Sequence, residues 1–161
     1  YELSSSKAQA IWTTPPGPVE LQAGLDRVSP EVVYLFGIDP GLDQPEKFLK
    51  RLVGLIKHVL NFNGGRASIS TLAQATAQRE TTVRVGIAWL VARGHIVMLE
   101  EKDEEEGKDG KDENGDRIHL AAASQTVSAG LPQITAQLKV LLQETAAYRA
   151  HFARADKESL M

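Results

Sequence analysis

Several residue types and patterns are missing from this sequence, and each absence narrows what the chain can be. It contains no cysteine among its 161 residues, which excludes a disulfide framework and thiolate metal sites and is typical of a cytoplasmic protein. No apolar run approaches the roughly 20 residues that a transmembrane helix needs, and no basic-then-apolar signal pattern opens the chain. We therefore expect a cytoplasmic protein that makes no contact with a membrane.

Residues that carry catalysis are also sparse. The histidines, His58, His95, His119 and His151, are scattered, and none stands next to an aspartate. His95 and His119 lack carboxylates at ligand spacing in a rigid element, which a zinc or two-metal site needs. There is no Gly-x-Ser-x-Gly elbow and no calcium-loop spacing of acids. The sequence therefore predicts no catalytic residue and no metal site within this chain.

The net charge of −3 conceals a separation of charge along the chain. Residues 45–99 carry two acids and eight bases, a net +6, whereas residues 100–116, EEKDEEEGKDGKDENGD, carry ten acids and three lysines, a net −7. The basic segment would attract nucleic acid or an acidic peptide. The acidic stretch is predicted to be either a solvated insertion or an electrostatic gate that competes with DNA for cations such as Lys57 or Arg93.

Residues 1–44 are predicted to form a small strand–helix–strand (βαβ) unit. Ala8–Thr13 is β-compatible, and the string TTPPGP ends that strand. The string VVYLF has five apolar residues in a row, as expected for a strand buried on both faces, and the connection is long enough for a helical crossover between parallel strands. Two strands are too few for a stable sheet, so we expect the unit to belong to a larger sheet or to lean on the rest of the chain. The helical face of the crossover is predicted to comprise Val19, Leu21, Leu25 and Val28.

Residues 45–122 are predicted to form a winged helix. A helix beginning at Pro45 is followed by a short strand at 67–69, a helix capped by Ser70 and a helix over 80–93. Two strands, HIVMLE and RIHLAA, then flank the acidic stretch, which takes the position of the wing loop. The first helix has an apolar face of Phe48, Leu52, Ile56 and Val59, and the third an apolar face of Val83, Ile87, Leu90 and Val91.

Residues 123–161 are predicted to contain one long helix. An apolar seam with spacings of four and three either docks this helix on the winged helix or pairs it with a second copy, so that a monomer and a weak dimer both stay open. The sequence thus predicts an α+β protein: a βαβ unit, a winged helix and a C-terminal helix that packs on it. The seam consists of Ile134, Leu138, Leu141, Thr145, Tyr148 and Phe152.

Candidate binding residues lie on two of the predicted helices. On the first helix, Lys47, Lys50, Arg51, Lys57 and His58 fall opposite the apolar face, where they either bind phosphates or serve solubility alone. The third helix presents polar residues at its N-terminal end, where a helix-turn-helix touches DNA. Its outward face carries Trp89, which we expect either to pack on another part of the chain or to stack on an unpaired base. The candidate contacts to nucleic acid or to a partner protein are Lys50, Arg51, Lys57, Arg66, Gln78, Arg79, Thr82 and Arg93.

The order of these elements resembles a known family. The strings IWTTPPGPVELQAGLDRVSPEVVYLFG and LKVLLQETAAYRAHFARAD, with the winged-helix-like segment between them, are similar to the C-terminal region of RecJ-type single-stranded-DNA exonucleases. The resemblance implies a 5′→3′ exonuclease whose catalytic core, of the Asp-His-His type and dependent on Mn²⁺ or Mg²⁺, lies in an N-terminal part. Because no Asp-His pair occurs here and the chain begins at Tyr1 rather than Met, we expect a noncatalytic fragment that needs no cofactor of its own.

Three functions follow as alternatives. The first is an accessory domain of such an exonuclease, in DNA repair and recombination, which binds single-stranded DNA, a single-strand-binding protein or another repair protein. The second is a winged-helix transcription regulator that dimerises through its C-terminal helix. The third is a protein-docking module whose basic face receives an acidic peptide.

Overall fold

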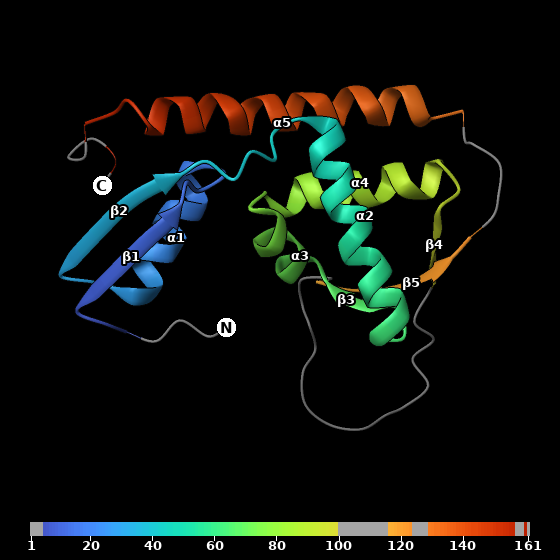
Figure 1. Cartoon of the computed structure of the whole chain (residues 1–161), viewed down its shortest axis with the longest axis horizontal. Helices are drawn as coiled ribbons and strands as arrows, with labels where there is room; N and C mark the ends of the chain where they lie inside the picture. Colours follow the sequence, from blue (N-terminus) through green and yellow to red (C-terminus); the bar gives the residue numbers. More distant parts are fainter. Residues whose placement is uncertain (1–4, 100–115, 124–128, 157–159, 161) are drawn as a thin grey trace.

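The structure is a computed structural model, and it describes residues 5–99, 116–123, 129–156 and 160. Within these residues the protein is of mixed α+β type, with five helices, a two-stranded sheet and a three-stranded sheet (Figure 1). Apart from Asp116, the acidic stretch lies outside the described residues. The two alternatives predicted for it, a solvated insertion and an electrostatic gate, therefore fall on residues that the structure does not describe.

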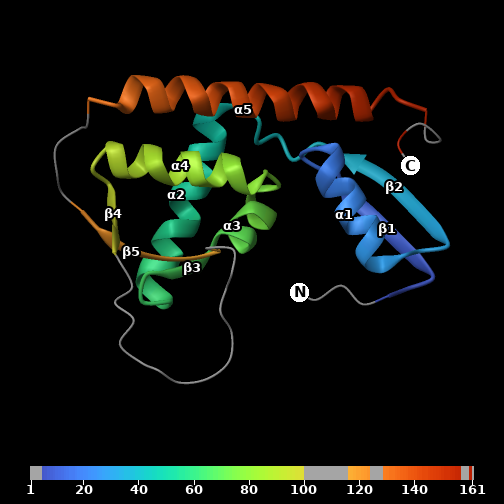
Figure 2. The same ribbon diagram turned by 180° about the vertical axis from the view of Figure 1, so that it is seen from behind.

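The N-terminal unit consists of β1 (Ala8–Thr13), α1 (Pro18–Val28) and β2 (Val32–Ile38). The two strands are parallel, with Ala8 opposite Val32, which confirms the predicted pairing. Pro18 stands in the first turn of α1, where its missing N–H costs nothing. Figures 1 and 2, which view the molecule from opposite sides, show that α1 covers one face of this sheet and leaves the other uncovered.

The prediction that β2 is buried on both faces is wrong. Its side chains alternate between half-buried and exposed, and Tyr34 and Phe36 are 57% and 56% exposed. On β1, Trp12 is likewise 60% exposed. The physical reason is that only α1 covers this sheet among the described residues, so alternate side chains point to solvent. Val19, assigned to the inner face of α1, is 73% exposed, whereas Leu21 and Val28 are buried.

The central part follows the predicted order of helix, strand, helix, helix and hairpin. The three strands form an antiparallel sheet in the order β3-β5-β4. The predicted apolar faces of the first and third helices are buried, except that Val91 is only half-buried. The elements are α2 (Pro45–Phe62), β3 (Arg66–Ser68), α3 (Ile69–Thr76), α4 (Glu80–Ala92), β4 (Ile96–Leu99) and β5 (Arg117–Ala122).

Helices α2 and α4 approach each other closely at Gly86. A Cβ at this position would lie 2.7 Å from a methyl carbon of Leu52 and 2.8 Å from the ring of Phe48, both of which are fully buried. Contacts this short do not occur between real carbon atoms, so a side chain at position 86 would push the two helices apart. The glycine in the sequence VRVGIAW therefore sets the distance between two helices of the core.

Helix α3 is capped differently from the prediction. Ser68, not Ser70, is the N-cap, and its hydroxyl accepts a hydrogen bond from the Thr71 backbone N–H at 3.0 Å. The strand ends one residue earlier than predicted, so Ser70 falls inside the first helical turn. There its backbone N–H and its hydroxyl donate to the carboxylate of Asp116, at 2.8 and 3.2 Å. The last residue of the acidic stretch thus supports a helix N-terminus.

Helix α5 (Leu131–Phe152) docks on the central part. Of the two predicted alternatives, docking and pairing with a second copy, the structure shows docking. Leu138 and Leu142 join the core formed by α2, α3 and α4. Both views show α5 extending beyond the central part toward the N-terminal unit (Figures 1 and 2), where a Cβ on Gly37 would lie 3.4 Å from the Phe152 ring. None of the described helices is long and apolar enough to cross a membrane.

The buried line of α5 differs from the predicted seam. It contains Leu142 and Arg149, whereas Leu141 and Tyr148 are only half-buried at its side. The predicted seam and the buried line share Leu138, Thr145 and Phe152, and both follow spacings of four and three residues. Apolar character alone favoured Leu141 and Tyr148 over their neighbours Leu142 and Arg149. An arginine lies in the buried line because the surrounding backbone and an aspartate supply its hydrogen-bond partners.

Candidate nucleic-acid interface

Two of the predicted contact residues are interior residues. Gln78 is 3% exposed, and its side-chain amide donates to the Leu42 carbonyl at 3.3 Å and to the Asp43 carboxylate at 2.9 Å. Thr82 is fully buried in the first turn of α4. Neither side chain is presented to solvent, so the expectation that they contact DNA is corrected. For Gln78 the reason is that the β2–α2 connection packs on the turn between α3 and α4.

Arg79 is engaged within the protein. Its guanidinium donates to Glu144 of α5 at 3.2 Å, and its side chain is 25% exposed. A Cβ on Gly17, the residue before α1, would lie 3.0 Å from Nε of Arg79. Arg79 therefore stands at the junction of α1, α4 and α5.

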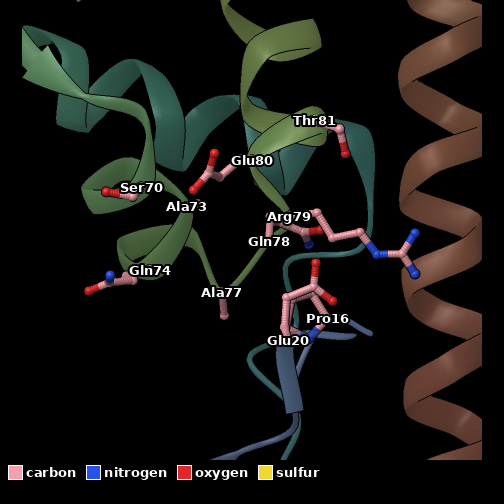
Figure 3. Close-up of a pocket in the computed structure, with 10 residues that line it drawn as sticks. All are labelled: Pro16, Glu20, Ser70, Ala73, Gln74, Ala77, Gln78, Arg79, Glu80 and Thr81. Atoms are coloured by element: carbon pink, nitrogen blue, oxygen red, sulfur yellow. The ribbon is translucent and has the colours of Figure 1, made fainter. Parts of the chain in front are cut away.

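A pocket of about 450 Å³ lies at this junction (Figure 3). Pro16 and Glu20 of the N-terminal unit line it together with α3 and the first residues of α4. The N-terminal end of α4, which a helix-turn-helix inserts into the DNA groove, thus faces the N-terminal unit. A groove of duplex DNA would have to displace that unit to reach it.

The side of α4 that carries Trp89 packs against α5, whereas Thr81, Arg84 and Ala88 are exposed. Trp89 is half-buried, and its indole N–H donates to the Thr135 hydroxyl at 3.0 Å. This contact agrees with the packing alternative for Trp89 rather than with base stacking. Arg93 is exposed, with its guanidinium carbon 5.3 Å from the centre of the Trp89 ring, within the range of a cation–π contact.

The cations of α2 occupy the face that the core leaves free. The side chains of Lys47, Lys50, Arg51, Lys57 and His58, here called the α2 basic face, are all exposed. Arg51 reaches α3, where its Nε donates to the Ala75 carbonyl at 3.4 Å, a long hydrogen bond. Arg79–Glu144 and Arg149–Asp43 are ion pairs of the described residues, and neither of these two pairs involves this face.

Two further features lie on the α2 basic face. Gly54 is exposed in mid-helix between Arg51 and Lys57, and no atom lies within 4 Å of where its Cβ would be. Phe62, at the end of α2, is 74% exposed, and its ring centre lies 4.8 Å from that of His58. One side of α2 thus carries cations on both sides of Gly54, followed by the exposed rings of His58 and Phe62. Arg66, exposed on β3, follows the turn that ends α2.

Sequence reasoning missed a polar junction centred on Arg149. This side chain is 4% exposed and donates to the Thr14 carbonyl at 3.3 Å, to the Asp43 carboxylate and to the Ala77 carbonyl. Burial lowers the pKa of Arg149 and raises that of Asp43, although each partner opposes the shift of the other. One side chain therefore joins β1, the β2–α2 connection, the α3–α4 turn and α5. The signal available in the sequence was an arginine seven residues after Leu142, in the line of a buried helix face.

No protein family, curated protein or solved structure matches this chain. The surface chemistry described above therefore carries the functional argument. Among the described residues, no three side chains of His, Asp or Glu converge as a metal site would require. His95 is exposed, and the Nε2 of His119 lies 3.1 Å from the Gly64 carbonyl.

Proposed function

We propose that this chain is a noncatalytic accessory domain that holds single-stranded DNA along the α2 basic face. The observation that carries the proposal is the exposure of three lysines, one arginine and one histidine on one face of an 18-residue helix. Lysines and arginines that neutralise phosphates release counterions, and this release supplies most of the sequence-independent affinity for nucleic acid. The contacts proposed are Lys50, Arg51 and Lys57 on α2, Arg66 on β3 and Arg93 at the end of α4.

Gly54 supports a close approach of the phosphate backbone. A glycine in the middle of an exposed helix costs roughly 0.5–1 kcal/mol relative to alanine, and none of the described residues packs against it. A bound strand would make use of the space, because the helix backbone is open between Arg51 and Lys57. The exposed rings of His58 and Phe62 offer stacking to an unpaired base at the same end of the helix.

We further propose that residues 45–122 are a winged helix. Support comes from the order of its elements and from the strand order β3-β5-β4, in which the two hairpin strands pair and the short strand joins the second of them. In this proposal the winged helix does not read a duplex with α4, since α5 packs along that helix and the N-terminal unit lies beside its N-terminal end. The packing of α5 on α4 and on the core within one chain argues against a transcription regulator that dimerises through α5.

The resemblance to RecJ-type exonucleases supports the wider assignment. In that assignment the single strand bound here is the substrate of a catalytic core elsewhere in a longer protein, and the Mn²⁺ or Mg²⁺ belongs to that core. In this proposal the present chain binds the single strand and supplies no catalytic group. A docking module for an acidic peptide, such as the tail of a single-strand-binding protein, uses the same cations and is the second candidate.

Charge reversal on α2 tests the proposal. Lys50→Glu with Lys57→Glu is compared with Lys139→Glu, which reverses an exposed lysine of α5 away from this face. Fluorescence anisotropy with a labelled single-stranded oligonucleotide, measured over a series of salt concentrations, gives affinity and salt slope. We expect the double variant to bind more weakly, with the slope reduced by about 0.7 per lost phosphate contact, and the control to bind as wild type.

The same titrations separate the two candidates. The docking module would be the better proposal if an acidic peptide binds, if Lys50→Glu with Lys57→Glu weakens that binding, and if oligonucleotides do not bind. Unchanged affinity and slope in the double variant would show that these cations serve solubility only.

A further inference from the structure

The uncovered face of the β1–β2 sheet is apolar and rich in rings. Its side chains alternate with those that face α1, and all of them are exposed. We call it the aromatic sheet face, and it consists of Ala8, Ala10, Trp12, Val32, Tyr34, Phe36 and Ile38. No charged residue belongs to it, so solvation of charge does not explain its exposure.

An exposed apolar sheet face of this kind is typical of a surface that another molecule covers. Parallel strands occur almost only in sheets covered on both faces, because both faces carry apolar side chains. The exposed area of these side chains is on the order of 500 Å², in the upper part of the range for the largest apolar patches of soluble proteins, which are often functional. One partner in a standard protein–protein interface buries about 800 Å². The area is therefore small for a stable dimer and suits two or three nucleobases.

The rings are held in a geometry suited to stacking. The ring centres of Trp12 and Phe36 lie 4.7 Å apart with an angle of 40° between their planes, and Tyr34 lies two residues from Phe36 on the same face of β2. Both strands are fixed from behind by α1 and beside Gly37 by Phe152 of α5. Aromatic side chains on the surface of a sheet are a recurrent platform for unpaired bases, since every base has a stacking face.

The β1–β2 sheet and α2 lie on the same side of the molecule, and the α2 basic face points away from α4 because Phe48 and Leu52 on the opposite side of α2 pack against Gly86. In Figure 1 both β1–β2 and α2 are in front, with α1 and α4 behind them, and Figure 2 shows the reverse. Lys47, the first cation of α2, lines a pocket of about 420 Å³ together with Gly37 and Asp39, so the start of α2 lies beside the end of β2. The carboxylates there are engaged, because Asp39 accepts from the Gly41 N–H at 2.8 Å and Asp43 pairs with Arg149.

We infer that the single strand whose phosphates follow the α2 basic face continues onto the N-terminal unit, where its bases stack on Trp12, Tyr34 and Phe36. This inference rests on the proposed function, and it adds a second, non-ionic subsite to it. Phosphate contacts on α2 alone would bind any polyanion. Stacking on the sheet restricts binding to nucleic acid with unpaired bases, and it disfavours a duplex, in which the faces of the bases are already stacked.

Two ring replacements and an abasic oligonucleotide test the second subsite. Trp12→Leu with Phe36→Leu keeps the face apolar and removes two rings, and because both side chains are exposed the fold is retained. Affinities are measured by anisotropy for a normal oligonucleotide and for one of equal length with abasic residues, which keeps all phosphates. We expect the ring variant to bind the normal strand about 5- to 100-fold more weakly, and to bind the abasic strand as wild type does. The control is Val140→Ala, which trims an exposed apolar side chain of α5 that takes no part in either proposed subsite.

The emission of Trp12 gives a second readout. In a Trp89→Phe protein the remaining tryptophan of the chain is Trp12, and we expect its fluorescence to be quenched by the normal strand and much less by the abasic strand. Binding that depends on Lys50 and Lys57 with no quenching, and with no effect of W12L/F36L, would overturn the inference and leave the proposed function intact. A blue shift of Trp12 that grows with protein concentration without DNA would identify the face as a contact between two copies, and would overturn it too. Absence of any oligonucleotide binding would overturn both proposals.

Discussion

Replacing Arg149 by methionine tests what holds the three parts of the chain together. Methionine keeps much of the length and apolar stem of arginine, but it removes the hydrogen bonds to Thr14, Asp43 and Ala77. The carboxylate of Asp43, with 14% of its side chain exposed, then loses its counter-ion in a largely dry environment. Removing one partner of a buried pair costs about 3–5 kcal/mol, which is a large part of the 5–15 kcal/mol by which domains are stable.

A double-mutant cycle assigns this cost to the pair. Asp43→Asn removes the charge and keeps an oxygen that accepts the hydrogen bond from Gln78. We expect Arg149→Met to lower the free energy of unfolding by about 3–5 kcal/mol, and the double variant to lose at least 1 kcal/mol less than the sum of the single losses.

Urea denaturation followed by circular dichroism measures these free energies, and limited proteolysis shows whether the N-terminal unit is released. Losses that add to within about 0.5 kcal/mol would mean that the two charges act independently. That outcome, or a loss below 1 kcal/mol for Arg149→Met, would refute the argument that this buried pair joins the parts.

Three further predictions follow from individual residues. Gly54→Ala should raise the free energy of unfolding by about 0.5–1 kcal/mol, because alanine is the better helix former and open space surrounds the position. Calorimetry should show a higher melting temperature. A lower melting temperature would mean that the fold needs the glycine. Burial raises the pKa of Asp116, but hydrogen bonds from Ser68 and Ser70 outweigh burial and lower it. Its stabilisation is therefore present above the unfolded-state pKa of about 4 and lost as pH falls through the lower folded-state value, so Asp116→Asn should flatten the acid limb of a stability–pH profile, and an unchanged limb would contradict the capping role. Purified protein incubated with Mn²⁺ or Mg²⁺ should leave labelled single strands intact on a gel, and digestion that survives repurification would show a catalytic group in this chain.

The local elements could be predicted from the sequence because neighbouring residues determine them. Pro45 starts α2, the spacing of Phe48, Leu52, Ile56 and Val59 sets its buried face, and both strands of the hairpin were located. The parallel pairing of β1 with β2 also followed, since the connection between them holds a helix. For the candidate site, the exposure of Lys50, Arg51 and Lys57 was implied by their position opposite an apolar face, because a helix has a fixed period.

The tertiary structure alone decided which polar residues lie inside. Gln78 and Thr82 stand at the start of a helix where sequence reasoning places DNA contacts, yet both are buried, and Gln78 donates to the β2–α2 connection. Arg149 has the composition of a surface residue and is buried, because Thr14, Asp43 and Ala77, up to 135 positions away in sequence, supply its partners. No local pattern encodes such long-range contacts.

The same distinction applies to the two surfaces on which binding is proposed. The sequence by itself determined the charge of α2 and the apolar character of VVYLF, since these are properties of the residues. Whether an apolar strand is buried depends on how many neighbouring elements cover it. Here α1 covers one face of the sheet only, which leaves Trp12, Tyr34 and Phe36 exposed. Burial is a property of the assembled fold, because it counts the atoms that other segments bring to a residue.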